Sequence, residues 1–345
     1  MTGTLAIIRG MSPPHRPETE TSRAEAERAL LLRLTEGPVS GDALAGELGL
    51  TRAAVWKRID ALRQAGVEID ARPGRGYALA RPLDLLNARI IRQHLSPDVQ
   101  AQLAALDVRW TLDSTNTALL AQAPPSHGLR VLLAERQQGG RGRLGRAWAS
   151  PLAANLYLSV DRQFAGGLAR LAGLSLVAGI AAAEALREVT SLDIRLKWPN
   201  DLWLEGRKLG GLLVEGGGEH GGPARAVIGL GLNVRMPEAF ARDIDQAWID
   251  LAARCEPPTR NRLVAALLSA WVPALDTFDR DGLAAFLPRW QALDALAGQR
   301  VRLINGNQTC DAEALGLASD GGLRVRDEQG ERIVYSGEVS VRPAA

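Results

Sequence analysis

Residues 135–148 read ERQQGGRGRLGRAW, and this stretch decides how the rest of the chain is interpreted. Between Gly139 and Arg146, four glycines and three arginines lie within eight residues. Glycine lets the backbone approach a ligand closely, and arginine presents a planar fork of donors that matches phosphate or carboxylate. Because this many glycines disfavour a helix or a strand, we expect the stretch to be mobile until an anion orders it. It predicts a loop that closes over an anionic small molecule.

Two other interpretations of this stretch are weaker. Gly140, Gly142 and Gly145 fit the G-x-G-x-x-G pattern of dinucleotide-binding folds, and residues 131–134 can form the strand before it. That fold requires a helix to open inside the pattern, whereas residues 156–160 alternate in hydrophobicity like a second strand. A disordered basic linker is the other alternative, and the ordered patterns on both sides argue against it.

Length and composition bound the class of protein. A chain of 345 residues with 46% hydrophobic content is expected to form two or three packed domains. Its net charge of +2 creates no overall field, so any nucleic-acid surface must be local. Cys255 and Cys310 lack the spacing of a zinc site or a disulfide framework. The N-terminus fits neither a signal peptide nor a membrane span. We therefore expect a cytoplasmic protein, with residues 1–22 as a disordered tail.

Residues 23–81 have the pattern of a winged helix-turn-helix. Ser40 and Thr51 are suited to cap two short helices, with Gly49 in the turn between them. A predicted hairpin with a basic tip follows, as a wing would, and the agreement of these features favours DNA over a protein partner or an inactive module. The helix after Thr51 would lie in the major groove, and the wing would touch phosphates. Candidate DNA contacts are Arg52, Trp56, Lys57, Arg72 and Arg75.

A polar run, Ser114-Thr115-Asn116, follows a predicted strand at 108–112. Such residues commonly cap a helix, and alone they would be interpreted that way. They also offer hydroxyl and amide groups to a polar ligand. Three further motifs begin at Lys197 (KWPND), Lys208 (KLGG) and Gly229 (GLGLN), and each is ordinary in isolation. Before them, residues 168–189 predict one long helix rich in alanine and leucine.

In this order and spacing, the loop and these motifs resemble the bifunctional biotin–protein ligases that also repress the biotin operon, the BirA family. The resemblance covers about residues 43–342. It implies an α+β chain with an N-terminal winged helix-turn-helix (23–81), a central mixed α/β ligase domain resembling class II synthetases (82–296) and a C-terminal SH3-like β-barrel (297–345). A bare structural cap is the alternative for the last domain. One departure is Leu144, where family members usually carry arginine.

The resemblance implies a two-step reaction. Biotin carboxylate attacks the α-phosphate of MgATP to form biotinyl-5′-adenylate and pyrophosphate. A lysine of the biotin carboxyl carrier protein of acetyl-CoA carboxylase then attacks the mixed anhydride. The adenylate would also be the co-repressor of a homodimer on palindromic operator DNA. ATP, Mg²⁺ and biotin are the implied ligands, and no membrane is implied.

The resemblance also assigns residues. Lys208, Arg143 and Asp201 would be catalytic, and Asp201 is also the candidate Mg²⁺ ligand. Biotin would be held by Ser114, Thr115, Asn116, Gln137, Arg141, Gly142, Arg143 and Lys208, and the nucleotide by Trp148, Lys197, Asn233 and Arg342. A lipoate-attaching ligase remains an alternative, although it lacks this combination of wing and loop. An inactive ligase that only senses biotin is disfavoured by the presence of Lys208, Asp201 and the arginines.

Overall fold

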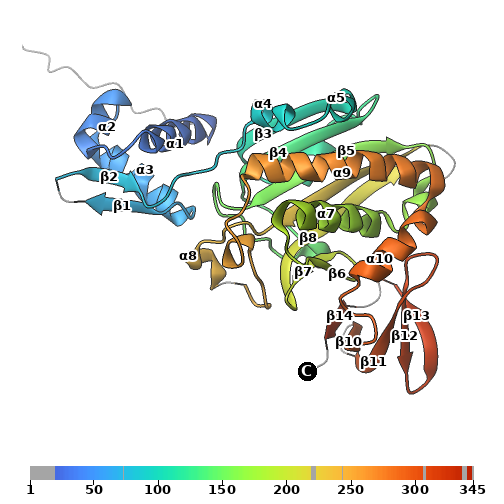
Figure 1. Ribbon diagram of the computed structural model, residues 1–345. Coiled ribbons are helices and arrows are strands. Elements are labelled where there is room, and N and C mark those ends of the chain that lie inside the picture. Colours follow the sequence, from blue (N-terminus) through green and yellow to red (C-terminus); the bar gives the residue numbers. More distant parts are fainter. Residues whose placement is uncertain are drawn as a thin grey trace, which may run out of the picture.

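The computed structural model describes residues 20–72, 74–218, 223–242, 244–305, 308–335 and 340–343. Within them the chain forms three sheets, of two, seven and five strands. Figure 1 shows that the small N-terminal group of elements and the C-terminal sheet lie on different sides of the large central part. No helix in the described ranges is both long and apolar enough to cross a membrane.

The N-terminal group has the predicted helix-turn-helix pattern. Helices α1 (Glu20–Thr35), α2 (Gly41–Glu47) and α3 (Arg52–Gln64) precede the antiparallel pair β1 (Ile69–Arg72) and β2 (Gly76–Leu79). The side chains of Ser40 and Thr51 accept hydrogen bonds from the amides of Ala43 and Ala54, so both predicted caps are present. Helix α1 begins at Glu20 rather than Arg23. The rest of the predicted tail lies outside the described residues.

The central sheet has the order β3-β4-β5-β9-β8-β7-β6, and only β3 and β4 pair in parallel. Two short helices, α4 (Ala88–Gln93) and α5 (Pro97–Ala101), precede it. Its strands are β3 (Leu103–Leu112), β4 (Leu129–Gln137), β5 (Leu156–Phe164), β6 (Arg195–Lys197), β7 (Asp201–Leu204), β8 (Arg207–Gly218) and β9 (Ala224–Leu232).

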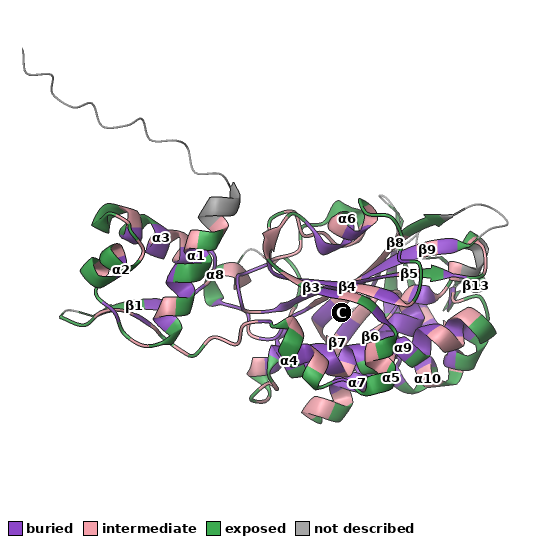
Figure 2. Ribbon diagram, turned by 90° about the horizontal axis from the view of Figure 1, so that it is seen from above, coloured by how far each residue is buried: buried purple, intermediate pink, exposed green. Residues whose placement is uncertain are grey.

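Helices cover the two faces of this sheet unequally. On one face lie α7 (Leu174–Thr190) and the long α9 (Arg260–Asp281), which are mostly buried and form the main core with α10 (Leu287–Leu293). Figure 2 shows the short α6 (Thr115–Leu120) on the opposite side of the strands. That second face is therefore covered by less helix than the first. A short helix, α8 (Glu238–Ala241), and a 3₁₀ turn, η3 (Leu251–Ala253), connect β9 to α9.

The single helix predicted over 168–189 is wrong. A 3₁₀ turn, η2 (Leu168–Leu171), comes first, and α7 starts only after Gly173, whose φ of 84° breaks the helical path. A Cβ at Gly173 would lie 2.8 Å from Leu283 of η4 (Leu283–Phe286). The close packing of η4 requires this glycine, which local periodicity does not reveal.

The C-terminal elements form an antiparallel sheet with the order β13-β12-β11-β10-β14. Its strands are β10 (Arg300–Asn305), β11 (Gln308–Leu317), β12 (Leu323–Asp327), β13 (Gly330–Val334) and β14 (Ser340–Pro343). Alternate residues such as Val301, Leu303 and Val325 are buried and join the main hydrophobic core. This sheet is therefore packed onto the central part.

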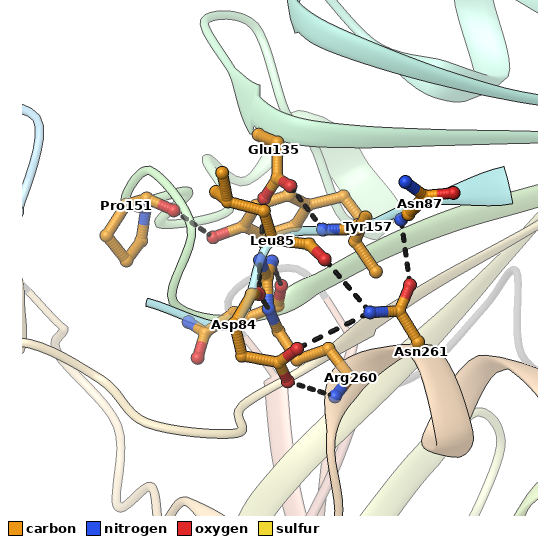
Figure 3. Close-up of polar contacts among 10 residues, drawn as sticks. Asp84, Leu85, Asn87, Glu135, Pro151, Tyr157, Arg260 and Asn261 are labelled. Atoms are coloured by element: carbon orange, nitrogen blue, oxygen red, sulfur yellow. Dashed lines mark hydrogen bonds and ion pairs between the residues drawn. The ribbon is translucent and has the colours of Figure 1, made fainter. Parts of the chain in front are cut away.

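A buried charged pair ties the segment after β2 to the central part (Figure 3). Arg260 and Glu135 are each only 2% exposed, and Nη2 of Arg260 lies 2.8 Å from Oε2 of Glu135. Arg260 also donates to the carbonyl oxygens of Asp84 and Asn155, while Glu135 accepts from the amide of Leu86. These contacts satisfy two charges that would otherwise be costly to bury.

The N-terminal group is also docked through apolar contacts. Leu152 and Ala153, which follow the Arg-Gly stretch, belong to the same buried cluster as Leu62 of α3. The amide of Leu152 donates to the carbonyl oxygen of Ala65 at 2.7 Å. The end of α3 therefore rests directly on the segment that leaves the predicted ligand loop.

Candidate ligand site on the open face of the sheet

Three glycines leave part of the central sheet without side chains. Gly211 of β8 lies opposite Gly231 of β9, and Gly229 lies two residues before Gly231 on the same face. A Cβ at Gly229 would lie 2.4 Å from Oδ1 of Asn116, and one at Gly231 would lie 2.4 Å from the indole of Trp148. Only glycine allows side chains to approach the backbone this closely. We call this surface the glycine floor.

Neutral polar groups gather at one end of the glycine floor. Ser114 caps α6, as predicted, and Thr115 and Asn116 are buried in its first turn. Oε1 of Gln137, at the end of β4, accepts from the amide of Thr115 at 2.8 Å and lies 3.1 Å from its hydroxyl. The structure thus brings these four predicted residues together, and the capping and ligand interpretations of the polar run are compatible.

Two residues at this end of the floor, Ser159 and Glu215, were not predicted from the sequence. The buried hydroxyl of Ser159 on β5 lies 2.7 Å from Oγ1 of Thr115 and 2.6 Å from Oδ1 of Asn116. The amide nitrogen of Asn116 donates to Oε2 of Glu215 on β8 at 2.8 Å. Oxygen and nitrogen of Asn116 therefore each have a defined partner. The available clue was a polar residue directly after an apolar one, Ser159 after Leu158 and Glu215 after Val214, which alone does not name its contact.

The Arg-Gly stretch forms a short hairpin loop, with a bridge between Arg141 and Ala147. The amide of Gly142 donates to Arg146 at 2.8 Å, and that of Trp148 donates to Gly140 at 2.9 Å. At its tip Leu144 and Gly145 have φ values of 58° and 70°, as in the type I′ turns of two-residue hairpins. Only a few backbone pairs are needed to close such a turn, even in a glycine-rich segment. That the loop is mobile until an anion orders it stays a prediction.

Two arginines of the hairpin reach the neighbourhood of the floor. Arg141 donates to Oγ1 of Thr117 at 2.7 Å and pairs with Glu215 at 3.0 Å. Nη1 of Arg143 lies 3.4 Å from Oδ1 of Asn200. Burial lowers the pKa of the Arg143 guanidinium, and the nearby negative charge of Asp201 opposes that shift. Leu144, by contrast, is 75% exposed.

A charged cluster occupies the other end of the floor. Nζ of Lys208 lies 2.9 Å from Oδ1 of Asp201, and Nζ of Lys197 lies 3.8 Å from Oδ2. Lys208 also lies 5.5 Å from the centre of the Trp148 ring, which covers Gly231. Two ammonium groups around one carboxylate leave a net positive charge, which suits a phosphate or carboxylate ligand. No three His, Cys, Asp or Glu side chains converge into a metal-binding group in the described part of the chain.

The described contacts of two other predicted residues, Asn233 and Arg342, do not join them to either cluster. Asn233 is buried, and its amide donates to the carbonyl oxygen of Ile249 at 3.1 Å. Arg342 lies on β14, but its side chain is outside the described residues.

The predicted DNA contacts lie on the N-terminal group, away from the floor. Trp56 of α3 is 57% exposed, and its neighbours Arg52 and Lys57 are also exposed. Arg72 and Arg75 are exposed at the end of the β1–β2 hairpin. Basic and aromatic side chains therefore line one helix and the wing beside it.

Three family models match successive regions of the chain. The chain matches the family models for an HTH domain over residues 27–78, the biotin/lipoate A/B protein ligase family over 109–233 and the biotin protein ligase C-terminal domain over 297–342. The biotin protein ligase of Aquifex aeolicus, solved in complex with biotin and ATP, aligns with a TM-score of 0.58 and 28% identity, covering 70% of this chain and 99% of that one.

Two curated relatives extend over most of the chain. The bifunctional ligase/repressor BirA of Bacillus subtilis (strain 168) is 29% identical over 88% of this chain and 94% of its own length. The protein of the same name from Escherichia coli (strain K12) is 40% identical over 88% of this chain and 93% of its own length. With its HTH, ligase and C-terminal regions all matched, this chain belongs to the BirA family of bifunctional ligase/repressors.

Proposed function

We propose that this protein is an ATP-dependent biotin–protein ligase that also represses biotin-synthesis genes. It forms biotinyl-5′-adenylate and transfers biotin to a lysine of the biotin carboxyl carrier protein of acetyl-CoA carboxylase. One observation carries the proposal: a floor of glycines joins a neutral hydrogen-bonding end, around Thr115 and Asn116, to a cationic end around Lys208. Biotin has the matching form, with a polar ureido ring, an apolar body and a terminal carboxylate.

In this proposal the neutral end holds the ureido group. Ser114, Thr115, Asn116 and Gln137 supply its donors and acceptors, and Arg141 and Gly142 close the hairpin over the ring. Lys208 holds the carboxylate so that its oxygen attacks the α-phosphorus while the bond to pyrophosphate breaks. Arg143 and Lys197 neutralise the negative charge, so catalysis rests on positioning and on fixed charges.

In the second step the carrier lysine attacks the carbonyl carbon of the adenylate. The bond to AMP breaks with its electron pair on the phosphate oxygen, and the amine gives its proton to solvent. Trp148, Asn233 and Arg342 complete the proposed nucleotide site. The half-buried indole of Trp148, whose ring centre lies 5.5 Å from Nζ of Lys208, supports its part. For Asn233 and Arg342 the support is their match to family positions.

Mg²⁺ belongs in this scheme to the MgATP substrate. Both carboxylate oxygens of Asp201 face ammonium groups, of Lys208 at 2.9 Å and Lys197 at 3.8 Å. This arrangement does not fit a resident cation at Asp201, because two positive charges already occupy its surroundings. We therefore assign Asp201 to the orientation of the two lysines.

The same protein is proposed to bind operator DNA as a homodimer loaded with adenylate. Exposed Trp56 and Lys57 on α3, with Arg72 and Arg75 on the wing, support DNA contact. The proposed domains are 23–81, 82–296 and 297–345, the last closing as an SH3-like barrel and the central one resembling class II synthetases. The proposed use of ATP and of operator DNA supports a cytoplasmic location for the protein.

The proposal is tested with purified protein, MgATP, labelled biotin and a carrier domain, with lipoate in parallel. Biotin-dependent pyrophosphate release and labelling of the carrier are expected, whereas lipoate should give neither. Lys208→Ala should abolish adenylate formation, since even one charge-assisted contact contributes about 1.5–3 kcal/mol to binding. Lys57→Ala, on α3, should leave the reaction unchanged. Attachment of lipoate, or full activity in Lys208→Ala, would contradict the assignment.

A further inference from the structure

The segment that carries Lys197 and Asp201 is attached to the C-terminal sheet through one indole. Trp198 is only 2% exposed, and its Nε1 donates to the carbonyl oxygen of Gly321 at 3.0 Å. Gly321 lies in the turn between β11 and β12, far along the chain. A buried indole N–H needs an acceptor, so this contact fixes where the ring can lie.

The acceptor is itself held firmly. The amide of Gly321 donates to Ala318 at 3.0 Å, and that of Ala318 donates to Gly322 at 2.8 Å. Gly321 has a φ of 88°, and a Cβ there would lie 3.0 Å from Leu176 of α7 and 3.1 Å from Leu283. The turn is therefore packed against the helical layer of the central part, and a side chain at this position would require Leu176 or Leu283 to shift.

The link reaches the charged cluster through a short piece of backbone. Lys197 and Asp201 are cross-strand partners in β6 and β7, and residues 198–200 form the turn between them. Asn200 anchors that turn to β8 through two hydrogen bonds with Leu212, of 2.6 and 2.8 Å. Trp198 provides a second anchor, to the C-terminal sheet.

We propose that Trp198 is a positioning residue for adenylate formation. Its bond to Gly321 holds the 198–200 turn so that Lys197, Asp201 and Lys208 keep their geometry around the nucleotide. Through this bond the C-terminal sheet supports the charged end of the site. Trp198 itself does not contact the substrate. This inference rests on the proposed ligase function.

The test compares Trp198→Phe with Trp271→Phe. Trp271 is a matched control, because it is fully buried and its Nε1 donates to the carbonyl oxygen of Ala178 at 2.9 Å, within the helical core. Both variants lose a buried indole hydrogen bond and should show similar falls in Tm. Only Trp198→Phe should lower kcat/KM for MgATP in adenylate formation, by about 10- to 100-fold, while the Kd for biotin stays unchanged. Equal kinetic effects in the two variants, or wild-type kinetics in Trp198→Phe, would overturn the proposal.

A second pair of variants tests the acceptor. Gly321→Ala should produce the same kinetic defect, because the added Cβ strains a turn at positive φ and presses it away from Leu176 and Leu283. Gly316→Ala is its control, since Gly316 also has positive φ (95°) in the same sheet but has open space around it. A defect in both variants would mean that strain in the sheet, and not the Trp198 anchor, is responsible.

A measurement without substrate separates this inference from the ligase proposal. Hydrogen exchange at the amides of Asp201 and Leu212 should accelerate in Trp198→Phe and not in Trp271→Phe. If the wild-type protein forms no adenylate, the ligase proposal fails, and exchange still tests the anchor. Unchanged exchange in Trp198→Phe would overturn the anchor even in an active enzyme.

Discussion

The guanidinium of Arg141, in the hairpin, lies 3.0 Å from the carboxylate of Glu215 on β8. The same carboxylate accepts a hydrogen bond from the amide of Asn116 at 2.8 Å. Glu215 thus connects Arg141 of the hairpin to Asn116 of α6, and both of these residues are proposed to hold biotin. Biotin carries a carboxylate, but its neutral ureido ring is proposed to lie at this end of the floor. An acidic side chain is therefore compatible with binding here, where it orients the groups that contact the ring.

Glu215→Ala should therefore weaken biotin binding. The amide of Asn116 would lose a hydrogen bond to a charged group, which contributes about 1.5–3 kcal/mol, so the Kd should rise about 10- to 100-fold. Isothermal titration calorimetry measures this directly. Glu205→Ala is the matched control, because Glu205 also pairs with arginine, Arg254, but in an exposed turn. Equal weakening in both variants would remove Glu215 from the site.

Arg143→Gly should still form adenylate but release it faster. The change removes a guanidinium close to Asn200 and makes the hairpin more costly to order. Free adenylate acylates any lysine, so bystander proteins should become labelled. The measurements are the half-life of bound adenylate and the labelling of albumin. An unchanged half-life with unlabelled albumin would show that the hairpin is not a lid.

Leu144→Asn should have the opposite effect. Leucine at a φ of 58° is strained by about 1 kcal/mol, and asparagine followed by glycine is the preferred pair for a type I′ turn. Easier closure should lengthen the half-life of bound adenylate by several-fold. Leu144→Ile keeps the size and apolarity but adds a β-branch that disfavours positive φ, so it should shorten the half-life. The same direction of change in both variants would contradict this account of the turn.

Arg72→Ala and Arg75→Ala should weaken binding to all DNA sequences alike. If each arginine neutralises one phosphate, the slope of log K against log salt should become shallower by about 1 per variant. Fluorescence anisotropy at several salt concentrations gives this slope. A change of base preference with an unchanged slope would mean that the wing reads bases rather than phosphates.

Arg260→Met should destabilise the protein strongly. It leaves Glu135 buried without its charged partner, and breaking such a pair typically costs about 3–5 kcal/mol. Urea unfolding measures the free energy of unfolding. The double variant Arg260→Met with Glu135→Met should recover part of the loss, because no isolated charge remains. A double variant less stable than the single one would show that the backbone contacts of Arg260 dominate.

Features set by neighbouring residues could be predicted from the sequence, and those set by distant packing could not. The caps at Ser40 and Thr51 depend on three or four residues each, and both are present. The break at Gly173 depends on Leu283, more than a hundred positions away.

The same distinction holds in the site. Thr115, Gln137, Asp201 and Lys208 could be named from motifs, and each lies in one of the two clusters. Ser159 could not, because a serine within a strand does not reveal that it faces Asn116. Long-range strand pairing decides that contact.

The docking of Leu152 and Ala153 into the winged-helix core limits how this DNA-binding module can be recombined. If residues 20–79 were fused to another protein, the apolar surface that Leu152 and Ala153 cover here would be exposed. The recipient protein would have to cover it with apolar side chains of its own. A ligase stripped of the module would in turn present Leu152 to water, and a polar replacement there should restore its solubility. Shuffling of this module, in evolution or in engineering, therefore has to change two separate stretches of chain together.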